Sequence, residues 1–323
     1  MWLHWIRIRA RGRRYRSGVA TRTRAFGASK REAHDARPFY DRFTAPVLTD
    51  DEHVNRCRVA DTLFTGDARD MGVVDDASIA LIVTSPPYFA GKEYEEALGD
   101  GHVPGSYLEY LEMLRDVFTE CVRVLEPGAR LAVNVANLGR KPYRSLAGDV
   151  TTILQDDLGL LLRGEIVWVK GEGATGSCAW GSFRSAANPV LRDLSERVVI
   201  TSKGRFDRAL SRKEREERSL PFENSISREE FMEATLDVWK LRPESARRVG
   251  HPAPFPVELP ERLIHLYTYL GDVVLDPFLG SGSTAVAAVR TGRHYVGFDT
   301  DPAYVALAEG RLAAEDGREE RAG

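Results

Sequence analysis

The sequence predicts an α/β fold in which helices cover both faces of a doubly wound, mostly parallel β-sheet. Short apolar runs at residues 79–83 and 273–275 are too short for helices and are typical of strands buried on both faces. Residues 111–125 show the apolar spacing of a helix that packs on such a sheet. A glycine-rich turn follows the second run directly and opens another helix, as in nucleotide-binding folds.

The run at 79–83 leads into the sequence Thr-Ser-Pro-Pro-Tyr at residues 84–88. Two successive prolines remove two backbone donors and fix the chain, so the Ser85 hydroxyl and the Pro86 carbonyl are held at the carboxyl end of the strand. Two such acceptors suit the two hydrogens of a planar amino group, and the Tyr88 ring offers a plane for stacking on a heterocycle. The structural alternative is a proline-terminated strand that feeds a surface loop.

The run at 273–275 leads into Asp-Pro-Phe-Leu-Gly-Ser-Gly-Ser-Thr at residues 276–284. The next expected strand, 294–298, ends in Asp299. In dinucleotide-binding folds an acidic residue at that position holds the ribose hydroxyls. The combination favours an adenosine-containing ligand over a purely structural turn. If the two motif strands are neighbours at the point where the strand order reverses, both motifs face one crevice.

Together the two motifs resemble the amino-group DNA methyltransferases that use S-adenosyl-L-methionine. Their order, with the Pro-Pro motif first, resembles the circularly permuted β class of that family. Ser before Pro-Pro resembles the members that act on cytosine N4. The resemblance covers about residues 60–312 and implies a Rossmann-like methyltransferase fold, double-stranded DNA as partner, and site-specific methylation of a flipped cytosine.

The resemblance also implies roles for individual residues. The catalytic roles fall on Ser85, Pro86, Pro87 and Tyr88. The cofactor-binding roles fall on Asp67, Phe255, Asp276, Pro277, Phe278, Gly280, Gly282, Ser283, Thr284 and Asp299. The expected DNA contacts are Lys92, Trp180, Ser182, Arg184, Arg205, Arg208 and Arg212. For Asp67 a turn or helix-cap role, and for Phe255 a structural lead-in to a helix, remain the alternatives.

The chain divides, by composition and resemblance, into five segments. These are a basic and disordered arm at 1–37, a catalytic half at 38–202, a target-recognition region at 203–250, a cofactor-binding half at 251–312 and a disordered tail at 313–323. Residues 1–31 hold ten Lys or Arg and no acid, which leaves the rest of the chain with a net charge of −13. Contacts with nucleic acid must therefore come from local basic patches, such as the one expected at 203–218. For the arm, an over-extended translation start and a contact with DNA phosphates are the alternatives.

Several further elements are predicted in chain order. An apolar edge ends in Gly66 and Asp67, and Ser106 with Glu109 forms a capping box ahead of the helix that is ended by residues 127–128. Strands are expected at 131–135, 165–170 and 197–201, and helices at 146–157 and 258–270.

Composition excludes several classes. No apolar run approaches the roughly 18 residues of a membrane span, and no metal-ligand spacing is present. The three cysteines show no paired spacing and fit a reducing interior, so a cytoplasmic, nucleoid-associated protein is expected. None of them follows a proline, as a cytosine-C5 methyltransferase nucleophile would. A cognate restriction endonuclease and a homodimer are the further partners that the resemblance suggests.

The motifs leave five alternative functions open. Methylation of adenine N6 is the nearest, because Ser before Pro-Pro is only a tendency. Protein-glutamine and RNA-guanine methyltransferases also use a Pro-Pro-aromatic motif, but they carry Asn before it and place the glycine loop earlier. A non-catalytic DNA-binding protein on the same fold predicts a damaged site, whereas both motifs are complete here. A nicotinamide dehydrogenase is disfavoured by the glycine spacing.

Overall fold

The structure is a computed structural model that describes residues 48–88, 104–137, 143–171, 184–191, 193–244, 249 and 254–322, the last seven of them by backbone only. The chain divides into two units, Met1–Ala45 and Pro46–Gly323, and all described residues lie in the second. The expected basic arm at 1–37 therefore lies outside the described residues. Among the described helices, none is long and apolar enough to cross a membrane.

A single eight-stranded sheet forms the centre of the second unit, with strand order β1-β8-β7-β2-β3-β5-β4-β6. The strands are β1 Thr62–Thr65, β2 Ile79–Thr84, β3 Leu125–Val135, β4 Leu161–Val169, β5 Ser195–Ser202, β6 Val238–Lys240, β7 Val273–Asp276 and β8 His294–Asp299. Every neighbouring pair is parallel except the two pairs that involve β5. The predicted doubly wound, mostly parallel sheet is confirmed.

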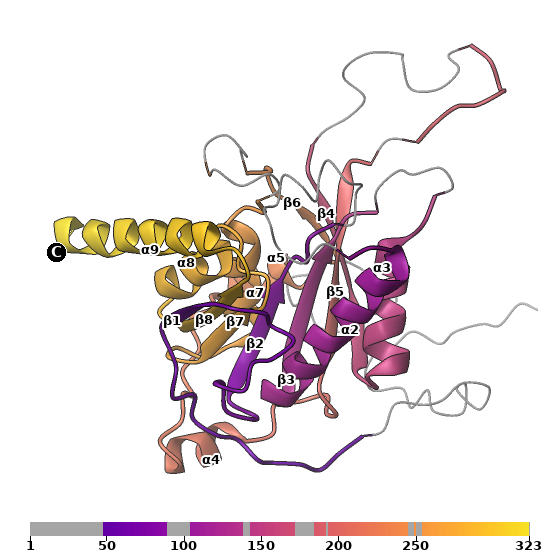
Figure 1. Ribbon diagram of the computed structural model, residues 1–323. Coiled ribbons are helices and arrows are strands. Elements are labelled where there is room, and N and C mark those ends of the chain that lie inside the picture. Colours follow the sequence, from indigo (N-terminus) through magenta and orange to yellow (C-terminus); the bar gives the residue numbers. More distant parts are fainter. Residues whose placement is uncertain are drawn as a thin grey trace, which may run out of the picture. The chain divides into compact units, whose positions relative to one another are not determined.

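Helices cover both faces of this sheet (Figure 1). On one face lie α2 (Tyr107–Val124) and α3 (Leu146–Thr152), which continues as the π-helical turn η3 (Ile153–Asp157). On the other face lie α7 (Glu258–Tyr267), α8 (Ser283–Arg290) and α9 (Pro302–Ala322). Successive side chains of β2 point to opposite faces of the sheet. Ile82 packs in the core under α2, and Leu81 packs in the core under α7 and α8.

The strand order reverses between β2 and β7. From β2 the chain continues to β3 on one side, and from β7 it continues to β8 on the other. The two strands pair directly, with Leu81 opposite Val274 and Ile82 opposite Leu275. Ligands of doubly wound sheets bind beyond the carboxyl ends of the strands at such a reversal. The strands that carry the two sequence motifs are therefore neighbours at this position, as predicted.

The predicted capping box of α2 forms in part. The Ser106 side chain accepts a hydrogen bond from the Glu109 backbone N–H, but the Glu109 carboxylate accepts from Gly105. The helix ends at Val124, three residues before the proline that was expected to end it. Leu125 already adopts the extended conformation and pairs with Ile79, so pairing with β2 begins β3 early.

Residues 203–250, expected to be a separate target-recognition region, are integrated into the fold. They contain α4 (Arg212–Glu217), α5 (Arg228–Ala234) and β6, which extends the sheet beside β4. The first part, 203–218, starts at the amino ends of the parallel strands, because the Lys203 ammonium donates to the carbonyls of Arg123 and Leu125 where α2 passes into β3. That edge is opposite the one that carries the two motifs.

The carboxyl-terminal segment also differs from expectation. Residues 313–323 were predicted to be a disordered tail, whereas α9 continues through Ala322. The segment is rich in Ala, Glu and Arg, which are strong helix formers. The prediction of disorder rested on its many charges and neglected this helix propensity.

Candidate functional site

The two motifs meet through buried hydroxyl groups. The Thr84 hydroxyl donates to Oδ1 of Asp276 at 2.6 Å, across 192 residues of sequence. The Thr284 hydroxyl lies 2.9 Å from Oδ2 of the same carboxylate and 3.1 Å from the carbonyl of Val83. All of these groups are buried. The Pro-Pro turn and the glycine loop therefore begin side by side at one edge of the sheet.

Asp276 supports this junction and does not present its carboxylate to the surface. The residue is only 1% exposed, and its Oδ1 also accepts from the backbone N–H of Phe278 at 3.1 Å. Burial raises the pKa of Asp276 to about 7, against the lowering effect of the hydrogen bonds from Thr84 and Thr284. The Asp276 carboxylate therefore binds the protein's own hydroxyls, and a part for this residue in cofactor binding stays a prediction.

The glycine loop requires glycine for two physical reasons. Gly282 has φ +76°, and a Cβ there would lie 2.6 Å from the Cβ of Ala308 on α9. Gly280 has φ +48°, and its N–H donates to Oδ2 of Asp299 at 2.8 Å. The Ser283 hydroxyl donates to the carbonyl of Phe255 at 3.0 Å and ties the loop to the segment before α7. The Phe255 side chain is itself buried in the core beneath α7 and α8.

Two carboxylates flank the loop at the ends of adjacent strands. Asp299 ends β8, and its backbone carbonyl accepts from the N–H of Gly66, which precedes Asp67. Burial raises the pKa of Asp299, although the N–H groups of Asp301 and Gly280 donate to it. Each oxygen retains a lone pair for a further donor. Asp67 is 42% exposed at its side chain and pairs with Arg69. Acceptors so placed suit the hydroxyl groups of a ribose.

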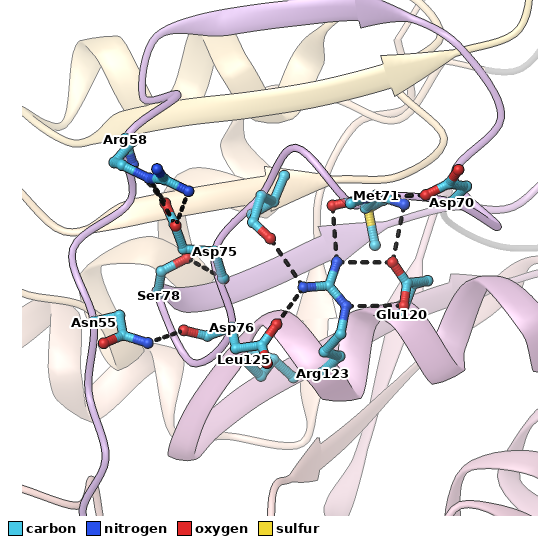
Figure 2. A network of polar contacts seen from close by, with 12 residues as sticks. Asn55, Arg58, Asp70, Met71, Asp75, Asp76, Ser78, Glu120, Arg123 and Leu125 are labelled. Atoms are coloured by element: carbon cyan, nitrogen blue, oxygen red, sulfur yellow. Dashed lines mark hydrogen bonds and ion pairs between the residues drawn. The ribbon is translucent and has the colours of Figure 1, made fainter.

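The loop that carries Asp67 is fixed from below by α2. Figure 2 shows the Arg123 guanidinium between Glu120, Asp76 and the carbonyl of Met71. Arg123 also donates to the carbonyl of Val74, and Glu120 accepts from the backbone N–H of Met71. These contacts tie both ends of the segment 71–76 to one helix.

At the Pro-Pro turn the structure reveals a polar cluster that the sequence reading missed. The Ser85 hydroxyl donates to the carbonyl of Asn134 at 3.1 Å and lies 3.1 Å from the Tyr88 hydroxyl. The Tyr88 hydroxyl donates to Oε2 of Glu196 at 3.1 Å, and the Asn134 amide donates to the same oxygen at 2.6 Å. The Lys170 ammonium lies 2.7 Å from Oε1 of Glu196.

The Tyr88 ring is not open for stacking in this conformation. The residue is 8% exposed and packs in the core under α2, because its hydroxyl is drawn inward to Glu196 and Asn134. The expected stacking plane is thus corrected for the described state.

The missed residues carried a weak signal. Asn134 interrupts an apolar strand near its carboxyl end, and Lys170 directly follows the apolar end of β4. Glu196 could not be placed at this edge from sequence, because its strand runs opposite to its neighbours.

The predicted DNA contacts fall into three groups. Lys92, Trp180 and Ser182 lie outside the described residues, and Arg184 is exposed after β4. Arg205 donates to the carbonyl of Asp51, and Arg212 lies 5.5 Å from the ring centroid of Phe222. Arg205 and Arg212 lie in the segment at the far edge of the sheet.

Arg208 is a structural residue, which corrects its predicted role. Its guanidinium is bound between the carboxylates of Glu126 and Asp272, and Arg215 binds the same two carboxylates from the other side. Burial alone would raise the pKa of Glu126, but the two guanidinium groups together lower it. Arg208 therefore has its charge neutralised inside the protein.

Across the described parts of the chain, no group of three or more His, Cys, Asp or Glu side chains is arranged to hold a metal ion. The candidate site consists of a glycine loop, two carboxylates and an amide-hydroxyl cluster on one edge of the sheet.

Comparison with solved structures defines the class of fold. Protein TTHA0409 of Thermus thermophilus, a candidate DNA modification methylase, matches with a TM-score of 0.59 at 30% identity, over 78% of this chain and 94% of its own. The same protein was solved in complex with S-adenosyl-L-methionine and matches with a TM-score of 0.58 at 29% identity. The cytosine-N4-specific PvuII DNA methyltransferase matches with a TM-score of 0.59, over 83% of this chain and 88% of its own, and at 20% identity it supports the fold alone. The fold is that of a methyltransferase.

Comparison with protein families gives the membership. The DNA methylase family of the N6 and N4 enzymes matches residues 79–310, which include both motifs. The type II methyltransferase M.MthZI of Methanothermobacter thermautotrophicus is 31% identical over 272 residues, 77% of this chain and 76% of its own length. M.Cfr9I of Citrobacter freundii is also 31% identical, over 79% and 88%. The chain belongs to the N6/N4 DNA methylase family.

Proposed function

We propose that this DNA methyltransferase transfers a methyl group from S-adenosyl-L-methionine to the N4 amine of a flipped cytosine at a specific site in duplex DNA. The observation that carries the proposal is the buried bond between Thr84 and Asp276. It places the Pro-Pro turn, suited to an amino group, beside the glycine loop, suited to a nucleotide-like cofactor. The Ser before Pro-Pro favours cytosine as the target, and the order of the motifs favours the permuted β class.

The residues of the glycine loop fit S-adenosyl-L-methionine. Gly280 and Gly282 keep the loop free of side chains, and Asp299 and Asp67 offer acceptors for the ribose and the adenosine part. Phe278 is only partly buried and adjoins the loop, whereas Pro277 fixes its entry. When bound, the cofactor supplies an electrophilic methyl group on a sulfonium.

Ser85 and the Pro86 carbonyl would hold the target amine. The lone pair of an exocyclic amine is delocalised into its ring, and hydrogen bonds from its two N–H groups concentrate electron density on the nitrogen. Alignment of the amine about 3 Å from the methyl group supplies much of the rate enhancement. Pro87 keeps the turn rigid. Extrusion of the base costs a few kcal/mol, and the buried Tyr88 ring, whose hydroxyl is bonded to Glu196, does not offset that cost by stacking in this conformation.

DNA is proposed to approach the edge of the sheet that bears the two motifs. Arg184, Trp180 and Ser182 follow the carboxyl end of β4 in the sequence, and Lys92 follows the carboxyl end of β2. The segment at 203–218 lies on the opposite edge. The type II names of the relatives favour a partner restriction endonuclease, and a homodimer is proposed on the same resemblance.

The decisive experiment incubates the protein with isotopically labelled S-adenosyl-L-methionine and plasmid DNA and identifies the modified nucleoside by mass spectrometry. N4-methylcytosine is expected. Labelled N6-methyladenine would replace cytosine by adenine as the target, and the absence of any labelled nucleoside would refute the proposed reaction.

Two variants separate the parts of the site. Ser85→Ala should lose methyl transfer while its cofactor affinity, measured by calorimetry, stays unchanged. Asp299→Ala should weaken cofactor binding first. Full activity of Ser85→Ala would contradict the amino-holding role, and unchanged affinity of Asp299→Ala would contradict the ribose assignment.

A further inference from the structure

Glu196 places a buried carboxylate at the Pro-Pro turn. It lies near the start of β5, whose antiparallel direction brings this end to the same edge as the carboxyl end of β2. The side chain is 9% exposed. It accepts hydrogen bonds from Tyr88 and Asn134 on one oxygen, and Lys170 lies against the other. Removal of a carboxylate from water costs free energy, which its partners repay only in good geometry. A buried carboxylate beside the Pro-Pro turn is therefore a candidate for a functional role.

The carboxylate decides the direction of each hydrogen bond around it. An ionised carboxylate only accepts, so the one hydrogen of the Tyr88 hydroxyl points to Glu196. Toward Ser85 the Tyr88 oxygen can then only accept. The Ser85 hydrogen therefore points inward, to the Asn134 carbonyl or to the Tyr88 oxygen, each 3.1 Å away. One lone pair of the Ser85 oxygen faces the Asn134 amide, whose Nδ2 donates to it at 3.4 Å, and the other remains available to an external donor.

The Asn134 amide is oriented by the same carboxylate. Its Nδ2 donates to Glu196 at 2.6 Å, and exchange of the amide nitrogen and oxygen would put two acceptors face to face. In this orientation Oδ1 is buried and has no hydrogen-bond partner among the described residues. An unsatisfied buried acceptor costs about 1–3 kcal/mol. The hydrogen bond from the Asn134 amide to Glu196 therefore holds this orientation although Oδ1 is left unsatisfied.

We propose that Glu196 is a positioning residue for methyl transfer, which sets the Ser85 hydroxyl as an acceptor toward the target amine. The inference rests on the proposed function, because it gives Ser85 the polarity that an amino-group substrate needs. Glu196 acts on Ser85 through the Tyr88 hydroxyl, fixes the orientation of the Asn134 amide, and does not itself touch the base. Lys170 balances its charge and fixes which oxygen faces the cluster.

The test reverses the polarity without changing the shape. In Glu196→Gln the amide oxygen stays with the Lys170 ammonium, so the new NH₂ group faces Tyr88 and Asn134. Tyr88 then accepts from that amide, and its own hydrogen turns to the Ser85 oxygen. We expect the single-turnover rate of methyl transfer, at saturating cofactor and DNA, to fall about a hundredfold, as for loss of one preorganised hydrogen bond. Cofactor affinity should stay unchanged. The matched control is Glu165→Gln at an exposed position of β4, which should alter neither quantity.

A double-mutant cycle identifies the route. In a Tyr88→Phe background the hydroxyl that transmits the reversal is absent, so Glu196→Gln should lower the rate by less than about threefold there. A full hundredfold loss in that background would overturn the proposal. So would a wild-type rate for the single variant Glu196→Gln, or a parallel loss of cofactor affinity, which would make Glu196 merely structural.

A second pair of variants tests the proposal even if Glu196→Gln fails to fold. Glu196→Asp and Glu196→Asn have the same length and differ in polarity, so the Asp variant should be the faster by at least about tenfold. Equal rates would overturn the positioning role. Failure of the proposed function is distinguishable, since it would appear as a wild-type protein that methylates no exocyclic amine in DNA.

Discussion

The hydroxyl of Thr84 donates a 2.6 Å hydrogen bond to the carboxylate of Asp276, and this bond joins the residue before the Pro-Pro turn to the first residue of the glycine-loop motif. Both partners are buried, so the bond is shielded from solvent. The pairing of β2 with β7, in which Ile82 lies opposite Leu275, fixes the register of the two motif strands. The distance between the amino-holding turn and the cofactor loop is therefore set by rigid strands and one internal bond, and not by mobile loops.

Asp276 should make stability depend on pH in an unusual direction. Because burial raises its pKa to about 7 in the folded protein, the folded state keeps a proton that the unfolded state releases near pH 4. Stability from this group is therefore present at low pH and falls as the pH rises toward 7, by about 1.4 kcal/mol per pH unit. In Asp276→Asn the amide oxygen can accept from Thr84 and the NH₂ can donate to Thr284, so this dependence should disappear.

Urea unfolding of wild type and Asp276→Asn at pH 5, 6, 7 and 8 measures the difference. The advantage of the wild type over the variant should shrink steadily up to pH 7 and then level. Parallel stability curves would mean that Asp276 is already ionised at pH 5.

The sequence was sufficient for the parts of the site that depend on local chemistry. The strands at Ile79–Thr84 and Val273–Asp276 and their order along the chain followed from apolar runs and turn residues. The position of Glu196 did not follow, because it depends on β5 running antiparallel, which is a tertiary choice. Arg208 was misassigned for a related reason: a basic run has the same sequence appearance whether its guanidinium groups face solvent or buried carboxylates.

Gly282→Ala should damage the loop from within. The residue has φ +76°, and the added methyl group would lie 2.6 Å from the Cβ of Ala308. We expect a loss of about 1–3 kcal/mol in unfolding free energy, together with weaker binding of S-adenosyl-L-methionine. Gly310→Ala is the matched control on α9, where the added Cβ meets no atom within 4 Å. It should stabilise the protein by up to about 1 kcal/mol, because Ala is the better helix former. Equal stability of both variants, measured by denaturant unfolding, would contradict the steric argument.

The buried ion pairs of Arg208 and Arg215 with Glu126 and Asp272 should contribute to stability and not to DNA affinity. Removal of one partner from a buried pair leaves an uncompensated charge, so Arg215→Met should cost about 3–5 kcal/mol. Arg212→Ala, in the same helix but exposed, should leave stability within about 0.5 kcal/mol of wild type. Arg212→Ala should also leave the salt dependence of DNA binding unchanged. A drop of about one in that slope would show that α4 contacts a phosphate after all.

Arg123 should control the order of the loop that precedes β2. Its guanidinium binds Glu120 and Asp76 and donates to the carbonyls of Met71 and Val74, so several contacts are lost at once in Arg123→Ala (Figure 2). Because the side chain is partly buried, we expect a loss of about 2 kcal/mol or more in unfolding free energy. Amide hydrogen exchange should quicken at Met71, whose N–H donates to the Glu120 carboxylate, and at Val74, whose N–H donates to the Met71 carbonyl.

The same helix offers a control that separates this clamp from an ordinary surface pair. Arg115 also pairs with a carboxylate, Asp157, but both side chains are substantially exposed. Exposed pairs contribute about 0–1 kcal/mol, so Arg115→Ala should unfold nearly as the wild type does. Because the clamped loop carries Asp67, Arg123→Ala should also weaken binding of S-adenosyl-L-methionine, whereas Arg115→Ala should not. If both variants bound the cofactor as tightly as the wild type, the clamp would serve folding alone, and Asp67 would need no support from α2 to reach the adenosine.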